Sequence, residues 1–135
     1  MLGKTRKFPP FVEMIGLTLV RQSPDHTETQ LRMRPELQNN KGNLHGGLIA
    51  TILDTSLGLA ARSDLDVRTS SATISLTVHY VGPARTDVRC ITRRVRRGGS
   101  ICFVEGRVID ANDDVVATGT GVFRLFEPAQ REAED

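Results

Sequence analysis

One long helix followed by a run of strands constrains the fold of this chain more than any other feature. Residues 45–62 place apolar side chains at helical spacing on one broad face, namely Leu48, Ile49, Ile52, Leu53 and Leu57. The patterns of strands follow at 71–80, 86–96, 100–110 and 115–126, with turn sequences between them. This order predicts an α+β architecture in which the helix covers one face of an antiparallel sheet.

The strand predicted at 71–80 alternates without a break. One side carries Ala72, Ile74, Leu76, Val78 and Tyr80, and the other carries Ser71, Thr73, Ser75, Thr77 and His79. The segment before the helix predicts shorter elements: a helix at 11–15 that ends at Gly16, strands at 17–22 and 27–34, and a loop at 36–43.

Length and composition limit the possible architectures and partners. A chain of 135 residues predicts one domain over residues 1–135, with an ordered core at about 9–127. The net charge of +2 is too small to indicate a nucleic-acid partner. No stretch resembles a membrane span or a signal peptide, which predicts a cytoplasmic protein without a membrane partner.

Cys90 and Cys102 lie in strand-like segments without metal-ligand spacing, and we expect two buried free thiols.

The second face of the predicted helix is made of small residues and one carboxylate: Gly47, Ala50, Thr51, Asp54, Gly58 and Ala61. A solvated face would carry Lys and Glu, so we expect another backbone or a ligand to approach here. Asp is a poor helix former without a capping role in mid-helix. A carboxylate withdrawn from water tends to have a raised pKa, which suits a general base or a nucleophile. A structural Asp bonded to a hydroxyl or an Arg is the alternative.

Two glycines, Gly46 and Gly47, stand at the start of this helix. They leave backbone N–H groups uncovered at the positive end of the helix dipole, and such an arrangement of donors can form an oxyanion hole. Glycines at a helix start also serve simply as turn residues. Gly46 and Asp54 are eight residues apart, about 12 Å along a helix, so one carbonyl cannot touch both. If they cooperate, they come from two subunits of a two-fold dimer.

The order of these residues resembles a known family. Asn39, Gly42, His45, Gly46, Gly47 and Asp54 form N-x-x-G-x-x-H-G-G-x-x-x-x-x-x-D, which is similar to the PaaI-like hotdog thioesterases, the group that contains phenylacetyl-CoA thioesterase. The likeness extends to Ile15-Gly16-Leu17, Tyr80-Val81-Gly82-Pro83-Ala84 and Gly119-Thr120-Gly121-Val122-Phe123, and so spans about residues 11–126. It implies a hotdog fold, a long central helix wrapped by an antiparallel sheet, in a homodimer that often pairs into a homotetramer.

The resemblance implies a role for each matching residue. The Gly46 amide would polarise the thioester carbonyl, and Gly47 would keep that approach open. Asp54 of the facing subunit would attack the carbonyl or activate water. Asn39 and His45 would orient the water or the thioester, with His45 alternatively bracing the loop. Thr73 would help to hold the water, and the variable spacing in the family leaves Ser70 and Ser71 as alternatives.

The implied reaction is hydrolysis of an acyl-CoA, with an aromatic or medium-chain acyl group, to the free acid and CoA. It requires no metal and no organic cofactor. The basic hairpin residues Arg93, Arg94, Arg96 and Arg97 are candidates for binding the phosphates of CoA, or form a solvated strand end. A non-catalytic acyl-CoA-binding hotdog module, a hotdog dehydratase and a purely structural oligomer are the alternative functions.

Overall fold

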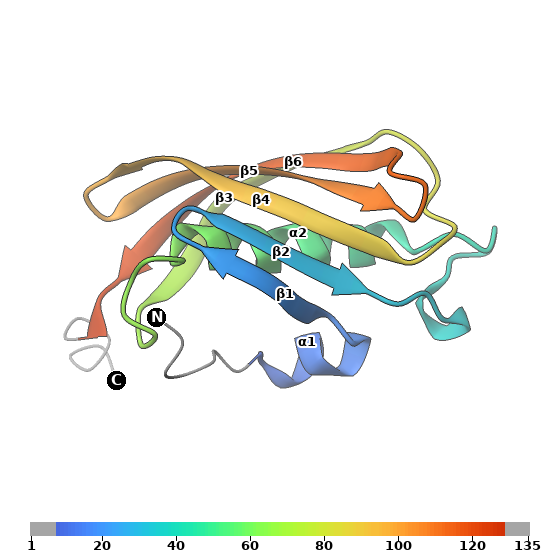
Figure 1. Cartoon of the computed structure of the whole chain (residues 1–135), viewed down its shortest axis with the longest axis horizontal. Helices are drawn as coiled ribbons and strands as arrows, with labels where there is room; N and C mark the ends of the chain where they lie inside the picture. Colours follow the sequence, from blue (N-terminus) through green and yellow to red (C-terminus); the bar gives the residue numbers. More distant parts are fainter. Residues whose placement is uncertain (1–7, 129–135) are drawn as a thin grey trace.

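In the computed structural model, which describes residues 8–128, a curved antiparallel sheet wraps around one long helix (Figure 1). The strand order is β1-β2-β4-β5-β6-β3. This is the predicted α+β hotdog architecture. The terminal segments expected outside the ordered core fall almost wholly outside the described residues. The elements are α1 (Pro10–Ile15), β1 (Thr18–Ser23), β2 (His26–Leu31), the 3-10 helix η1 (Pro35–Leu37), α2 (Gly46–Ala61), β3 (Ser70–Tyr80), β4 (Val88–Gly98), β5 (Ile101–Asp110) and β6 (Val115–Phe126).

The core lies between α2 and the sheet. Leu53 and Leu57 of α2 are fully buried, which confirms the predicted apolar helix face. At Gly119 of β6, an added Cβ would lie 3.1 Å from both δ-carbons of Leu53, so a glycine is needed for this close approach of strand and helix. Cys90 and Cys102 are buried free thiols, as predicted. No helix within residues 8–128 is long and apolar enough to cross a membrane.

The unbroken alternation predicted for residues 71–80 is wrong. A β-bulge interrupts the pairing of β3 with β6 between Thr73 and Ser75, and Ile74 is the extra residue. Beyond the bulge, Leu76, Val78 and Tyr80 share one side of the strand, as predicted, and pair with buried positions of β6. Before the bulge, the side chains that face α2 are those predicted for the opposite side of the strand. Thr73 therefore pairs with buried Phe123 and points toward α2.

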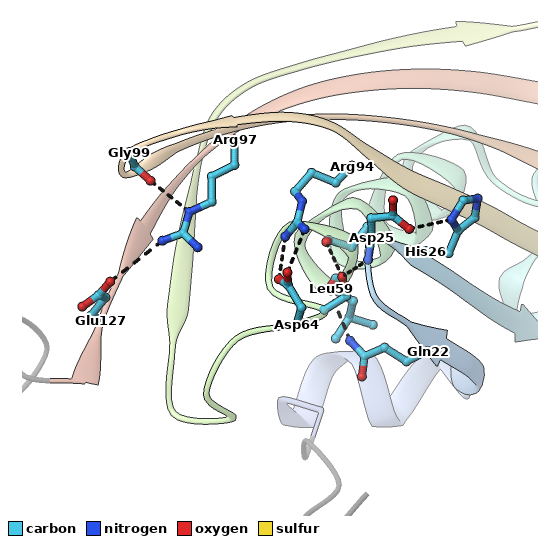
Figure 2. A network of polar contacts seen from close by, with 11 residues as sticks. Gln22, Asp25, His26, Leu59, Asp64, Arg94, Arg97, Gly99 and Glu127 are labelled. Atoms are coloured by element: carbon cyan, nitrogen blue, oxygen red, sulfur yellow. Dashed lines mark hydrogen bonds and ion pairs between the residues drawn. The ribbon is translucent and has the colours of Figure 1, made fainter. Parts of the chain in front are cut away.

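The end of α2 is tied to the hairpins around it by a network of polar contacts (Figure 2). The Gln22 side chain donates to the Leu59 carbonyl at 3.4 Å, and the Asp25 N–H donates to the Ser63 hydroxyl at 2.8 Å. Arg94 of β4 forms a bidentate salt bridge with Asp64, with N–O distances of 2.6 and 2.9 Å. These contacts join β1, β4 and the segment after α2, and so fix where the helix ends.

This ion pair makes the stability of the fold dependent on pH. Hydrogen bonds from Arg94 hold the pKa of Asp64 below its ordinary value. A carboxyl whose pKa is lower in the folded chain stabilises it above about pH 4, and that contribution is lost as the pH falls through the folded pKa. Because Asp64 is 37% exposed, we expect Asp64→Asn to lower the free energy of unfolding by only about 0.5–1 kcal/mol at pH 7.

Chemical denaturation at pH 7 and at pH 3 measures this effect. The difference between the wild type and Asp64→Asn should be largest at pH 7 and smaller at pH 3. Asp114→Asn, at an exposed turn residue, serves as a control that should change little at either pH. An equal loss of stability by Asp64→Asn at both pH values would contradict an ionic origin.

Candidate active site

Asp54 occupies the middle of α2 and faces the first half of β3. The Thr73 hydroxyl donates a hydrogen bond to Asp54 Oδ1 at 2.7 Å. This contact depends on the bulge at Ile74, because strict alternation would turn Thr73 to the outer face of the sheet. Asp54 is half-buried in the single protomer, so its withdrawal from water is less complete than the sequence predicts. A carboxylate held by one hydroxyl keeps a second oxygen available for chemistry.

The start of α2 is held by His45, which is its N-cap. The Gly47 N–H donates to His45 Nδ1 at 2.9 Å, so a neutral His45 carries its proton on Nε2 and can donate from there. An added Cβ at Gly47 would lie only 3.1 Å from that Nδ1, which explains the glycine. Asn39 turns its side chain back on its own loop and accepts from the N–H groups of Lys41 and Asn43.

The Gly46 N–H is the open donor at this helix start. Within residues 8–128, the Gly47 N–H is used by His45, whereas the Gly46 N–H has no acceptor. The Tyr80 hydroxyl donates to the Gly46 carbonyl at 2.8 Å, and its ring lies 3.4 Å from where a Gly46 Cβ would stand. Tyr80, at the end of β3, therefore braces the peptide unit directly after the open amide.

The two halves of the site are thus held at different ends of the same strand. Asp54 is bonded to Thr73 near the start of β3, and Gly46 is bonded to Tyr80 at its end. Within one protomer, the eight residues between Gly46 and Asp54 separate them by about 12 Å along α2. No three His, Cys, Asp or Glu side chains of the described chain lie together as metal ligands would.

Comparison with known proteins identifies the family. A profile of the thioesterase superfamily matches residues 41–117, which is more than half of the chain and includes both Gly46 and Asp54. The chain belongs to the thioesterase superfamily. A proposed esterase of Halobacterium salinarum is 34% identical to it over 126 residues, covering 85% of this chain and 83% of that relative.

Solved structures agree with this membership of the thioesterase superfamily. A conserved protein of Pseudomonas aeruginosa is 29% identical, with a TM-score of 0.83, over 88% of this chain and 95% of that chain. A Bacillus halodurans protein, whose crystal structure contains CoA, is 35% identical, with a TM-score of 0.69, over 73% of this chain and 66% of that chain.

The four arginines of the β4–β5 hairpin do not form one patch in this superfamily member. A bulge between Arg94 and Arg96 places Arg93 and Arg96 on the outer face of the sheet, and Arg94 and Arg97 on the helix side. Arg93 pairs with Glu105, Arg94 with Asp64, and Arg97 with Glu127 at 3.9 Å (Figure 2 shows the last two). In the described part of the chain, Arg96 alone of the four has no carboxylate partner.

Two residues near the site were given no functional role by the sequence. Tyr80 is the only tyrosine of the chain, but in a strand pattern it looks like one more large side chain. Arg62 follows α2, and its Nη1 donates to the Ser71 hydroxyl at 2.5 Å beside the region of Asp54. Ser71, predicted as one alternative to Thr73 for holding the water, accepts this hydrogen bond from Arg62.

Proposed function

We propose that this chain is an acyl-CoA thioesterase of the PaaI-like group, which hydrolyses R–CO–S–CoA to the acid and free CoA across the interface of a homodimer. One observation carries the proposal: β3 holds Asp54 near its start, through Thr73, and Gly46 at its end, through Tyr80. An antiparallel pairing of two β3 strands about a two-fold axis would bring the start of each beside the end of the other. Asp54 of one subunit would then approach Gly46 of its partner.

The free edge of β3 supports such a pairing. Within residues 8–128, β3 pairs on one side only, with β6. Its 11 residues include no Asp, Glu, Lys or Arg. Proteins usually protect an exposed edge of this length with charge, because unpaired N–H and C=O groups recruit other strands. Ile74 and Tyr80 on this strand are 56% and 55% exposed in the single protomer. A second copy of the chain would cover both the edge and these side chains.

The proposed chemistry assigns a role to each group. The Gly46 amide, at the positive end of α2, would stabilise the oxyanion formed when the thioester carbonyl is attacked. Asp54 would attack that carbonyl or remove a proton from the attacking water, and Thr73 would hold the carboxylate in place. His45 would orient the thioester through Nε2–H, while Asn39 would keep the loop before α2 in position.

Arg96 is the hairpin residue best suited to bind a phosphate of CoA, because three of the four arginines already pair with carboxylates. A phosphate near Arg93, Arg94 or Arg97 would have to compete with those partners. The Bacillus halodurans relative, crystallised with CoA, supports a CoA thioester as the substrate.

Release of free thiol from a panel of aromatic and medium-chain acyl-CoAs tests the function, with the dimer measured by light scattering at the assay concentration. We expect hydrolysis by a dimer or a larger assembly, such as a dimer of dimers. Tight binding of acyl-CoA without thiol release would instead favour a non-catalytic binding module. A stable monomer that still turns over thioester would contradict the shared site.

Thr73→Val tests the contact between β3 and the carboxylate. Valine has a similar shape, so the strand should be retained, but Asp54 loses its hydrogen-bond donor. We expect kcat to fall about tenfold, since a misplaced catalytic group slows the reaction without abolishing it. Steady-state kinetics beside Thr77→Val, on the outer face of β3, would show whether the loss is specific to this position.

A further inference from the structure

The peptide unit between Gly46 and Gly47, at the start of α2, is held at both of its polar atoms. Its carbonyl oxygen, on Gly46, accepts a hydrogen bond from the Tyr80 hydroxyl at 2.8 Å. Its N–H, on Gly47, donates to His45 Nδ1 at 2.9 Å. One peptide unit therefore connects the end of β3 to the imidazole that caps the helix. The open Gly46 N–H belongs to the preceding peptide unit.

His45 stands at a position where Ser, Thr, Asp or Asn is usual, because a short side chain with one oxygen is sufficient to cap a helix. An imidazole that accepts with Nδ1 must, when neutral, carry its proton on Nε2. The His45 N–H donates to the Leu37 carbonyl at 2.9 Å, which fixes the backbone from which the ring extends. This N-cap therefore presents a second polar atom, the Nε2–H, at the head of the helix.

Packing in the core does not explain an aromatic residue at Tyr80, which is 55% exposed in the single protomer. Its ring lies 3.4 Å from where a Gly46 Cβ would stand, so ring and helix start are in close contact. In a helix, the Gly46 carbonyl is also directed at the N–H four residues later, and the Tyr80 hydroxyl uses its second lone pair. Phe would suit a strand as well as Tyr. The hydroxyl adds only a donor, and that donor is directed at this peptide.

The two hydrogen bonds on the peptide strengthen each other. A donor at the carbonyl oxygen draws electron density through the conjugated C–N bond and makes the N–H of the same peptide a better donor. A stronger bond from Gly47 to His45 Nδ1 favours the tautomer with its proton on Nε2. Such strengthening is about 10–30% per bond, so we expect a several-fold effect on a rate and not its abolition.

We propose that Tyr80 is a positioning residue for His45: its hydroxyl, through the peptide between them, holds the ring in place and keeps its proton on Nε2 for contact with the thioester. The inference rests on the thioesterase function proposed above and adds to it a residue that acts through another. The Nε2–H donates to the thioester while Asp54 of the other subunit acts on the carbonyl. Tyr80 lies on the strand proposed to pair with a second copy, so the dimer would shield its hydrogen bond from water.

Tyr80→Phe tests the inference kinetically, because it keeps the ring and removes only the hydroxyl. We expect kcat for acyl-CoA hydrolysis to fall about five- to tenfold, the scale of one neutral hydrogen bond, with KM changed less than about twofold. In a His45→Asn background, an amide oxygen still caps the helix but no imidazole remains, so Tyr80→Phe should cost less than about twofold. Thr77→Val, which removes a hydroxyl from the outer face of the same strand, is the matched control and should leave kcat unchanged.

The tautomer of His45 can be measured without any assay of activity. In long-range ¹H–¹⁵N spectra at alkaline pH, the nitrogen that carries the proton has a shift distinct from that of the other. We expect His45 of the wild type to be protonated on Nε2, and its two nitrogen shifts to approach each other in Tyr80→Phe. The spectrum of His45→Asn identifies these signals. His26, whose Nδ1 lies 2.9 Å from an Asp25 carboxylate oxygen, is an internal reference for the opposite tautomer.

His45 protonated on Nδ1 in the wild type would overturn the inference without any variant, even if Tyr80→Phe failed to fold. An unchanged kcat in Tyr80→Phe would also overturn it, as would an equal loss from Tyr80→Phe in both backgrounds, because a hydroxyl with a purely structural role gives that result. Full activity of His45→Asn would reject the role of the ring. These outcomes leave the proposed thioesterase function intact, whereas no hydrolysis of any acyl-CoA by the wild type would reject that function and the inference together.

Discussion

Asp54→Asn is expected to lower kcat for acyl-CoA hydrolysis by at least about a hundredfold, the usual scale for loss of a catalytic base. Asparagine has nearly the same shape and can still accept the hydrogen bond from Thr73, so the helix and β3 should stay in place. It cannot act as a base or as an effective nucleophile at neutral pH. Asp54→Ala should cause a loss of similar size, and KM should change less than kcat in both variants.

Asp114→Asn, at an exposed turn far along the chain, supplies the control and should retain full activity. Thiol release under steady-state conditions is sufficient for the comparison. Single-turnover hydrolysis in labelled water would then distinguish a nucleophilic Asp54, which incorporates label into the protein, from a general base, which does not. Wild-type rates in Asp54→Ala would exclude the mechanism.

Gly46→Pro is expected to lower kcat by about a hundredfold to a thousandfold, as the loss of one oxyanion-hole donor does. Proline removes the N–H of this one residue, and the first position of a helix tolerates proline because its N–H has no partner in the helix. The preceding residue, His45, is already extended, with φ −59° and ψ 137°, as proline requires. The substitution therefore removes the donor and keeps the helix.

Gly46→Ala is the matched control, because it adds a similar Cβ but keeps the N–H. That Cβ would meet the Tyr80 ring at 3.4 Å, an ordinary contact, so we expect a loss of less than about tenfold. Circular dichroism would verify that both variants keep the helix. Equal activity of Gly46→Pro and Gly46→Ala would show that the amide does not carry the oxyanion.

The same two substitutions also test whether the site is shared between subunits. In a heterodimer of Asp54→Asn with Gly46→Pro, one site has both defects and the other has none. Random mixing makes half of the dimers heterodimers, so co-refolded variants should recover about a quarter of the wild-type activity. No recovery from a mixture shown to contain heterodimers would place both groups in one subunit.

The fold was largely predictable because its patterns are local. Helical spacing from Leu48 to Leu57 predicted α2 to within one residue at each end, and turn residues separated β4, β5 and β6. The bulge at Ile74 was not predictable, since Ser71 to Tyr80 alternates without a break and only the pairing with β6 reveals the extra residue. The position of β3 at the sheet edge likewise depends on contacts between distant segments.

The site was predictable to the extent that its residues follow a spacing. Asn39, His45, Gly46 and Asp54 form a pattern in the sequence, and the structure places His45 at the N-cap of α2, Gly46 at its first residue and Asp54 at its middle. Tyr80 and Arg62 carry no such pattern, because each reaches its position only through the fold, by way of β3 and the end of α2. The pairing of Asp54 with Gly46 across subunits remains a prediction.

The extra residue at Ile74 separates β3 into two segments. Which side chains of one segment point toward α2 can change without affecting the other segment. Inserting or deleting one residue there would reverse the orientation of Ser71 and Thr73 while leaving Leu76, Val78 and Tyr80 packed as before. Evolution could therefore move the hydroxyl partner of the carboxylate by one position without disturbing the other half of the strand. In alignments of relatives, a gap at this point would mark an exchange of hydroxyl residue rather than the loss of a catalytic group.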